Sequence, residues 1–394
     1  MSFDNPIRVG FVGSGFAARF HYESLKRLPG SSVRMVGVYS PKAEHRLEFA
    51  RERGLEAFET LDALLDVVDV VHVVVPAAAH ESVLIRALQR GVVPIVEKPF
   101  TGYFGPPDDP SFRGNEFSKE KMLEGALASA ARIRAAEAES GLRICYAENW
   151  IFTPAIQKEI EIIQKTKAQI LWMIGEEAHS GSHSPHYGIW RESGGGSLMG
   201  KGTHPLTTVL YLKRVEGLAR LGRPIRPKSV SARVHELIRL PAYEDKGFLR
   251  TDYTDVEDWG SIHLTFDDGM IADVFSSEVV MGGVHNWLEV LANNHRTRCN
   301  INPIDGLETY NPVDAQFKDV YVVEKIGTKQ GWSKPAMNED WMNGYVQEME
   351  YFYDIIARDE APLASSELGF DTVSALYSAY LSAERHGAEV LIPT

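Results

Sequence analysis

Cysteine is almost absent from this chain, because its 394 residues include only Cys145 and Cys299. Two cysteines are too few for a framework of disulfides or for a zinc site built of thiolates, and they fit a reducing compartment. The first residues also lack the basic and apolar regions of a secretory signal peptide. From these absences we expect a cytoplasmic protein.

Long apolar runs and basic blocks are missing as well. No stretch of about 18 apolar residues occurs, so neither a membrane span nor a membrane partner is expected. The net charge of −13, without a basic block, argues against a nucleic-acid partner, which would require a cationic face. The remaining composition, with 44% hydrophobic and 24% charged residues, is that of an ordinary globular protein long enough for two domains.

The chain begins with a pattern typical of dinucleotide binding. A strand expected at residues 7–12 leads into Gly-x-Gly-x-x-Ala at 13–18, and a helix is expected over 17–27. The glycines allow a tight turn and let the backbone approach a pyrophosphate, while the helix offers free N–H groups. An ordinary strand–helix turn is the alternative. The residues expected to contact the dinucleotide are Gly13, Ser14, Gly15, Phe16 and Ala17.

Strands and helices alternate through the rest of the first half. Strands are expected at 33–39, 67–75 and 92–97, and helices at 42–53, 61–65 and 82–90. The nearly continuous β-branched run at 67–75 is typical of a parallel strand that is buried on both faces. This alternation predicts a doubly wound parallel sheet.

The pattern changes in the second half. Residues 101–117, rich in Gly, Pro and Asp, predict an extended loop, after which Ser118 caps a helix at 119–140 and a strand follows at 142–146. Period-two alternation then predicts strands at 229–237, 259–266 and 271–277, the last two joined by an Asp-Asp-Gly hairpin turn. Helices are expected at 154–165, 205–212, 341–357 and 371–386.

The sequence therefore predicts an α/β fold of two domains. Residues 1–149 are expected to form a dinucleotide-binding Rossmann domain with a doubly wound parallel sheet. Residues 150–394 are expected to form an α+β domain for substrate binding and oligomerisation, built on a large, open, mostly antiparallel sheet. The C-terminal helix is expected to return towards the first domain.

A second motif ends the strand at 92–97. Glu97-Lys98-Pro99 places a cation at the sheet edge where open α/β sheets bind ligands. The ammonium of Lys98 would face the nicotinamide, hydrogen-bond the hydroxyl being oxidised and stabilise developing negative charge, unless Lys98 is only a solvated loop residue. Glu97 is expected to orient the local backbone or the cofactor.

The end of the second strand should select the adenosine ribose. Tyr39-Ser40-Pro41-Lys42 contains no carboxylate, which tilts the prediction slightly towards NADP. Ser40 could instead hydrogen-bond a ribose hydroxyl while Lys42 lies in solvent, so NAD and NADP both stay open. Pro76 and His80 follow another strand and are expected near the cofactor, with a structural or a catalytic role for His80.

Taken together, these motifs resemble the Gfo/Idh/MocA family of NAD(P)-dependent oxidoreductases. The resemblance rests on residues 13–18, 73–76 with His80, 97–99, and the glycine-rich segments 194–196 and 202–204. It implies a Rossmann domain and a C-terminal domain whose open sheet faces the cofactor and often mediates oligomers. It also implies a carbohydrate, cyclitol or polyol substrate, and we therefore expect a homodimer or homotetramer.

One departure from the family pattern concerns the site histidine, His204. Many members carry Asp four residues before this histidine and often three residues after it, where this chain has Gly200 and Thr207. We therefore expect the usual carboxylate–histidine pairing to be absent, which puts a direct transfer of the sugar or inositol dehydrogenase mechanism in question.

His204 is the best candidate for the general base. Imidazole titrates near neutrality, which suits removal of a hydroxyl proton as hydride leaves carbon. A structural histidine at a helix start is the alternative. Lys201 would assist the base or bind an anionic substrate group.

The segment 179–191 holds three histidines and three serines in its first nine residues. A metal site is disfavoured because the spacing matches no helical zinc motif. The loop is either solvated or part of a substrate pocket, in which Tyr187 and Trp190 would stack on a sugar and Arg191 would clamp an acid group. The residues expected to bind substrate are Asn149, His183, Tyr187, Trp190, Arg191 and His204; core packing at the domain junction is the alternative for Asn149.

Three functions compete. The first is transfer of hydride between a nicotinamide and a hydroxyl-bearing carbon, with Lys98 polarising the oxygen and His204 as acid and base. The second is a glycoside hydrolase that uses tightly bound NAD for transient oxidation, elimination and re-reduction. The third is a non-enzymatic sensor that binds dinucleotide, against which Lys98 and His204 argue.

Overall fold

A computed structural model describes residues 6–28, 33–182, 184–302, 306–323 and 325–394. The chain divides into two compact units, which are described separately. Unit 1 comprises Met1–Tyr103, Glu124–Glu148 and Tyr345–Val373, and unit 2 comprises Phe104–Leu123, Asn149–Gly344 and Ser374–Thr394.

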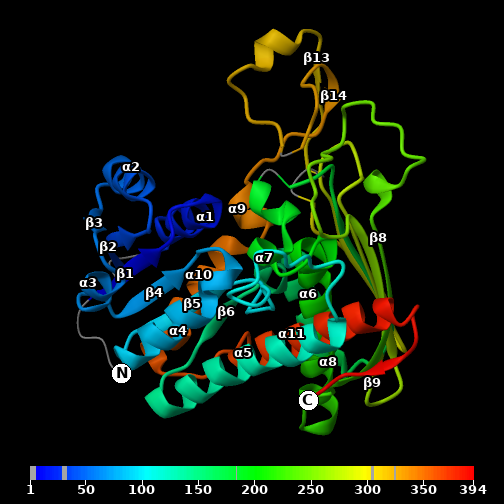
Figure 1. The fold of residues 1–394 in the computed structure, drawn as a ribbon, viewed down its shortest axis with the longest axis horizontal. Helices are drawn as coiled ribbons and strands as arrows, with labels where there is room; N and C mark the ends of the chain where they lie inside the picture. The colour runs from blue at the N-terminus through cyan, green and yellow to red at the C-terminus, as the bar shows by residue number, and fades with distance from the viewer. Residues whose placement is uncertain (1–5, 29–32, 183, 303–305, 324) are drawn as a thin grey trace. The chain divides into compact units, whose positions relative to one another are not determined.

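Unit 1 contains a parallel sheet of six strands in the order β3-β2-β1-β4-β5-β6 (Figure 1). The strands are β1 Ile7–Val12, β2 Val33–Tyr39, β3 Glu56–Phe58, β4 Val70–Val73, β5 Val93–Glu97 and β6 Cys145–Ala147. All residues of β4 and β5 are buried, as expected for central strands covered on both faces. The predicted parallel sheet is confirmed, and the sequence analysis missed only the short edge strand β3.

The helices of unit 1 connect these strands and cover the sheet. They are α1 Phe16–Leu25, α2 Ala43–Arg53, α3 Leu61–Leu65, α4 His80–Gln89 and α10 Tyr345–Arg358, with one 3₁₀ turn at Ala77–Ala79. Two long helices, α5 Lys119–Ser140 and α11 Ser366–Glu384, contribute residues to both units. The second segment of unit 1 ends at Glu148, one residue before the domain boundary expected from the sequence.

One predicted helix is wrong. A continuous helix was expected over 341–357, but α9 Glu339–Met342 and α10 are separate, and Gly344 between them has a φ of +86°. A Cβ at Gly344 would lie 2.4 Å from the carbonyl oxygen of Asn149. The close approach and the positive φ both require glycine here, and they interrupt the helical pattern.

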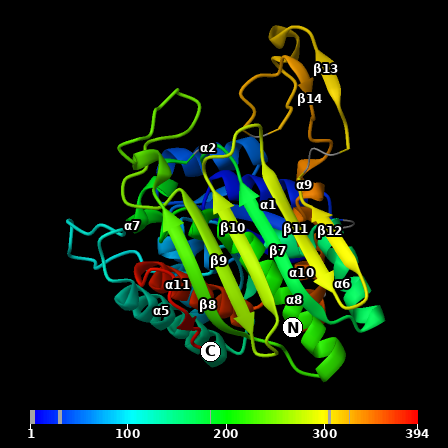
Figure 2. The same ribbon diagram turned by 90° about the vertical axis from the view of Figure 1, so that its right-hand side faces the viewer.

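Unit 2 contains a sheet of seven strands in the order β12-β11-β7-β10-β9-β8-β15, seen face on in Figure 2. The predicted mostly antiparallel sheet is confirmed, with β7 and β10 as the parallel neighbours. The strands are β7 Ile170–Ala178, β8 Pro227–His235, β9 Trp259–Phe266, β10 Ile271–Ser277, β11 His285–Ala292, β12 Arg296–Asn300 and β15 Val390–Leu391. The predicted hairpin joins β9 to β10, with Gly269 at a φ of +81°.

The helices of unit 2 are α6 Pro154–Thr166, α7 Trp190–Ser193, α8 Thr203–Leu221 and α9. Helix α8 is longer than predicted and packs on β7, while a single π turn, Leu198–Gly202, precedes it. A small hairpin pairs β13 Thr309–Asn311 with β14 Gly331–Ser333. The 3₁₀ turns of unit 2 are Asn149–Phe152, Pro185–Gly188, Leu237–Arg239 and Asp314–Phe317. Among the described residues, no helix combines the length and the apolar character needed to cross a membrane.

Candidate functional site

The glycine loop after β1 fits a pyrophosphate. Gly13 has a φ of +113°, and a Cβ there would lie 2.4 Å from the carbonyl oxygen of Val74, so the turn requires glycine. Gly15 is the N-cap of α1, and a Cβ there would meet no atom within 4 Å. Helix α1 has neither a side-chain cap nor an acidic residue in its first turn. An open backbone at an uncapped helix N-terminus is the surface that an anionic diphosphate requires.

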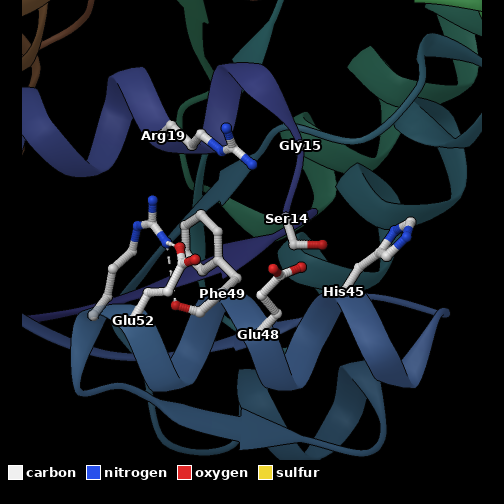
Figure 3. Close-up of a pocket in the computed structure, with 8 residues that line it drawn as sticks. Ser14, Gly15, Arg19, His45, Glu48, Phe49 and Glu52 are labelled. Carbon is white, nitrogen blue, oxygen red and sulfur yellow. Dashed lines mark hydrogen bonds and ion pairs between the residues drawn. The ribbon is translucent and has the colours of Figure 1, made fainter. Parts of the chain in front are cut away.

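A cavity of about 240 Å³ lies beside this loop, between α1 and α2 (Figure 3). Its lining carries charges of both signs, with Arg19 on α1 and His45, Glu48 and Glu52 on α2. Phe16, which follows Gly15, is 59% exposed, whereas Ser14 and Ala17 are half-buried. Gly13 is therefore held in the tight turn that a dinucleotide site requires. Gly15 and the side chain of Phe16 are accessible beside it.

The turn after β2 is stabilised by a residue that the sequence analysis did not single out. Ser40 is 8% exposed, and its carbonyl oxygen accepts a hydrogen bond of 2.8 Å from Nη1 of Arg46. Lys42 is exposed and is the N-cap of α2. Arg46 belongs to no motif, so only the fold indicates that a second cation accompanies Lys42 near this turn.

His80 ties together two loops of unit 1. Its ring nitrogens lie 2.9 Å from the carbonyl oxygen of Pro99 and 3.0 Å from that of Val75, and burial lowers its pKa. These contacts join the loop after β4 to the loop after β5, which contains the cis peptide Lys98-Pro99. The contacts favour the structural alternative for His80, while Pro76 beside it is exposed.

Glu97 accepts hydrogen bonds on both carboxylate oxygens. Its Oε2 accepts the backbone N–H of Lys98 at 3.0 Å, and its Oε1 lies 3.0 Å from Nε2 of His21. His21 in turn contacts His72, and His72 contacts the hydroxyl of Tyr353. Glu97 thus holds the backbone of Lys98. No sequence motif indicated the row of side chains behind Glu97, because His21, His72 and Tyr353 come from three distant segments.

In unit 2, His204 has a carboxylate neighbour. It is the second residue of α8 and 6% exposed, and its ring stacks on Trp150 with centroids 5.7 Å apart. Its Nε2 lies 3.8 Å from Oε2 of Glu177 on β7. The usual carboxylate positions hold Gly200 and Thr207, as the sequence analysis noted, but strand β7 brings a different carboxylate, Glu177, beside the ring. The alternation of apolar and polar residues did not predict strand β7, so Glu177 was not among the predicted site residues.

Lys201 belongs to the π turn before α8 and is 1% exposed. Its ammonium forms an ion pair with Glu278, which also accepts hydrogen bonds from the hydroxyl of Tyr253 and the backbone N–H of Ser182, each at 2.9 Å. The nearest described atom to a Cβ at Gly200 is in the ring of Tyr187, at 3.5 Å. The positive charge of Lys201 is compensated within the protein, which favours a role in orientation over direct binding of an anion.

Two residues that were predicted to bind substrate, Trp190 and Arg191, contact other protein groups instead. Trp190 is 1% exposed and packs on Tyr380, with ring centroids 4.9 Å apart. The guanidinium of Arg191 donates to the carbonyl oxygens of Pro106 and Asp109. Both arrangements favour packing roles, because neither side chain presents its polar or aromatic face to a ligand.

The remaining substrate predictions have mixed outcomes. The amide of Asn149 donates to the carbonyl oxygen of Asn343 at 2.7 Å, and Asn149 is 7% exposed. Tyr187 is half-buried in the 3₁₀ turn at Pro185–Gly188. The prediction for His183 lies outside the described residues. Within the described ranges, no group of three or more His, Cys, Asp or Glu residues could hold a metal ion.

The parallel sheet with its glycine cradle is that of a dinucleotide-binding Rossmann domain. A model of the oxidoreductase family Gfo/Idh/MocA, described as an NAD-binding Rossmann fold, matches residues 7–105. The model of the Gfo/Idh/MocA C-terminal domain matches residues 163–296. The two matches together cover more than half of the chain, which belongs to the Gfo/Idh/MocA family and carries an NAD-binding Rossmann domain.

Each of two curated dehydrogenases matches about a quarter of the chain. UDP-N-acetylglucosamine 3-dehydrogenase of Acidithiobacillus ferrooxidans is 38% identical over 95 residues, which are 24% of this chain and 29% of that protein. Inositol 2-dehydrogenase of Corynebacterium glutamicum is 32% identical over 98 residues, again 24% of this chain and 29% of that protein. The matched region spans less than a third of each relative, so their activities come to this chain only as proposals.

Solved structures match the whole fold. GenD2 from gentamicin A biosynthesis, crystallised in complex with NAD, has a TM-score of 0.79 at 23% identity, covering 99% of this chain and 97% of that chain. A myo-inositol 2-dehydrogenase from Lactobacillus plantarum has a TM-score of 0.71 at 16% identity, covering 99% of this chain and all of that chain. At these identities the likeness establishes the fold.

Proposed function

We propose that this protein is an NAD(P)-dependent dehydrogenase that transfers hydride between the nicotinamide and a hydroxyl-bearing carbon of a sugar, cyclitol or related polyol. The observation that carries the proposal is the pairing of His204 with Glu177 in a buried environment. An imidazole beside a carboxylate is suited to accept a hydroxyl proton, because the carboxylate stabilises the imidazolium that forms. Without a base of this kind, a dinucleotide-binding fold alone would fit a sensor equally well.

The cofactor would be held by the loop Gly13–Ala17, whose open N–H groups face the pyrophosphate. When bound, the nicotinamide supplies the hydride acceptor or donor. The two cations near the turn after β2, Lys42 and Arg46, would tolerate the 2′-phosphate of NADP, and Ser40 would bond the ribose hydroxyl of NAD. Both cofactors therefore belong in the tests of activity.

The reaction divides between two side chains. Lys98 would donate a hydrogen bond to the substrate oxygen and stabilise the negative charge that develops there. The imidazole of His204 would take the hydroxyl proton during oxidation and return it during reduction. Glu177 would stabilise the charged ring, and Trp150, stacked on the imidazole, would fix the ring plane. Lys201, held by Glu278, would orient the start of α8 and thereby His204.

The substrate class rests on the relatives, whose names specify oxidation of a sugar nucleotide, an inositol and glucose 6-phosphate. All three compounds are polyhydroxylated rings.

We further propose a cytoplasmic homodimer or homotetramer assembled through the open sheet of unit 2. Its strand β7 exposes Leu171 and Trp172, at 40% and 37% of their surface. Sedimentation velocity of the purified chain tests this assembly.

The function is tested by incubating the protein with NAD or NADP and a panel of UDP-N-acetylglucosamine, myo-inositol, glucose 6-phosphate and aryl glycosides. Absorbance of the reduced nicotinamide and released aglycone are recorded in parallel. A steady rise in reduced cofactor with a free hydroxyl compound supports the dehydrogenase. Release of aglycone without net reduction would instead establish the hydrolase that uses NAD transiently, and binding of dinucleotide without any turnover would favour a sensor.

A further inference from the structure

Four elements of unit 1 meet at a buried row of polar side chains (Figure 1 labels α1, β4, β5 and α10). The hydroxyl of Tyr353 on α10 lies 2.7 Å from Nε2 of His72 on β4. Nδ1 of His72 lies 2.7 Å from Nδ1 of His21 on α1, and Nε2 of His21 lies 3.0 Å from Oε1 of Glu97 at the end of β5. Both imidazoles are completely buried, and Tyr353 and Glu97 are 5% and 8% exposed.

The direction of this row follows from donor and acceptor rules. Only one proton can lie between the two Nδ1 atoms, and His72 is neutral because burial, and next the neighbouring His21, lower its pKa well below the usual range. Tyr353 keeps its proton because burial raises its pKa well above the usual range. Among the described residues the hydroxyl of Tyr353 has one hydrogen-bond partner, His72, so it donates to Nε2 of that ring. His72 must then donate from Nδ1 to His21.

The opposite end of the row is an acceptor. Glu348 on α10 is fully buried, and neither of its carboxylate oxygens has a hydrogen-bond partner among the described residues. Burial, followed by the charges of Glu97 and Glu148, raises the pKa of Glu348 well above its usual range. Because Nδ1 of His21 accepts from His72, Nε2 of His21 carries a proton and donates to Oε1 of Glu97, whose Oε2 accepts the backbone N–H of Lys98.

We propose that Tyr353, His72 and His21 form a directed hydrogen-bond relay, each donating towards Glu97, and that His21 and His72 are positioning residues for Lys98. The inference rests on the proposed function, in which Lys98 polarises the substrate oxygen. With Oε1 fixed by His21, the carboxylate of Glu97 keeps Oε2 against the backbone of Lys98. Because His21 belongs to α1, the relay also connects the loop of Lys98 to the helix whose N-terminus would bind the pyrophosphate.

Nuclear magnetic resonance of the full chain labelled with ¹⁵N-histidine tests the relay without any assay of activity. Signals of the two rings are assigned by their loss in H21Q and H72Q. The relay predicts a neutral His72 protonated at Nδ1 and a neutral His21 protonated at Nε2. A His72 protonated at Nε2, or a His21 carrying both protons, would overturn the direction inferred for the relay.

Kinetics of two variants of His21 test the positioning role. In H21Q the side-chain oxygen can accept from His72 and the amide can donate to Glu97, so kcat should stay within about threefold of wild type. H21L can do neither, and kcat should fall about tenfold to a hundredfold while the substrate KM changes less than about twofold. A kcat in H21L equal to that of wild type would refute the role. If H21Q loses as much as H21L with folding intact, His21 moves a proton itself and does not merely position Lys98.

A matched pair of tyrosines on α10 completes the test. Y353F removes the terminal donor of the relay and should lower kcat, whereas Y351F changes a hydroxyl that accepts from the backbone N–H of Leu363 and should leave kcat unchanged. Equal kcat values in the two variants would overturn the contribution of Tyr353. Failure of wild type to reduce either dinucleotide would refute the proposed function instead, and the ¹⁵N signals would still decide whether the relay exists.

Discussion

Nε2 of His204 lies 3.8 Å from Oε2 of Glu177, although the two residues belong to different secondary-structure elements of unit 2. His204 is the second residue of α8, and Glu177 is the penultimate residue of β7, on which α8 packs. The pairing therefore depends on tertiary structure. It provides the buried base of the proposed reaction with a stabilising charge, although neither helix position expected to carry a carboxylate has one.

Replacement of Glu177 tests that charge. E177Q keeps the shape of the side chain but cannot stabilise the imidazolium, so kcat should fall about tenfold to a hundredfold. Dinucleotide affinity should not change, because the glycine cradle belongs to unit 1. Steady-state kinetics together with calorimetric titration of the cofactor check both statements. A variant with an unchanged kcat would remove Glu177 from the mechanism.

Replacement of His204 itself should have a larger effect. H204Q retains a polar side chain of similar reach but cannot accept a proton at neutral pH, and kcat should fall at least about a hundredfold. Cofactor binding should persist, which fluorescence of the reduced dinucleotide can measure. The control is H263Q, because His263 pairs with Asp273 at a partly exposed position of the sheet. If H204Q turns over as fast as H263Q, His204 is a structural histidine.

The two glycines of the cradle should respond differently to alanine. G13A introduces a methyl group 2.4 Å from a carbonyl oxygen at a φ of +113°, so it should lower the free energy of unfolding by about 1–3 kcal/mol. G15A places its methyl group in open space and should leave that free energy nearly unchanged. The methyl group would nevertheless obstruct the approach of a pyrophosphate, raising the Kd of the dinucleotide about tenfold. Urea titration measures the free energy of unfolding, and calorimetry measures the Kd of the dinucleotide. If G15A binds the dinucleotide as tightly as wild type, the pyrophosphate does not bind at this loop.

The pH dependence of stability should contain a contribution from Glu257. This carboxyl is fully buried, and burial raises its pKa to about 7 despite hydrogen bonds from Leu198 and Tyr380. The folded state binds the proton more tightly than the unfolded chain, so this contribution is present at low pH. It is lost as the pH rises from about 4.5 to about 7, by about 3 kcal/mol over that window.

The difference between wild type and E257Q isolates this contribution. The amide cannot ionise, so the variant should lack that part of the pH dependence, whatever its stability at one pH. Urea unfolding of both proteins at several pH values between about 5 and 7.5 measures the difference. Parallel stability curves for the two proteins would show that Glu257 titrates alike in the folded and unfolded states.

Local pattern was sufficient for much of the fold but for little of the contact geometry. The buried run around Val70–Val73 and the turn at Gly13 predicted the parallel sheet, because hydrophobic periodicity and glycine placement are local signals. Strand β7 does not alternate regularly between buried and exposed side chains, and several of them are only half-buried. The strand was therefore not predicted, and Glu177 on it was missed. Similarly, tryptophan is a residue type that stacks on sugars, but only the structure shows that Trp190 is buried against Tyr380.

Transfer of deuterium tests the central claim most directly. The compound most active in the panel is deuterated at its hydroxyl-bearing carbons and incubated with wild-type protein and the preferred dinucleotide, and the reduced dinucleotide is analysed by mass spectrometry. The dehydrogenase account predicts one deuterium in each reduced dinucleotide and a slower turnover of the labelled substrate. Reduced dinucleotide without deuterium, or deuterium that exchanges into solvent while no reduced dinucleotide accumulates, would contradict it.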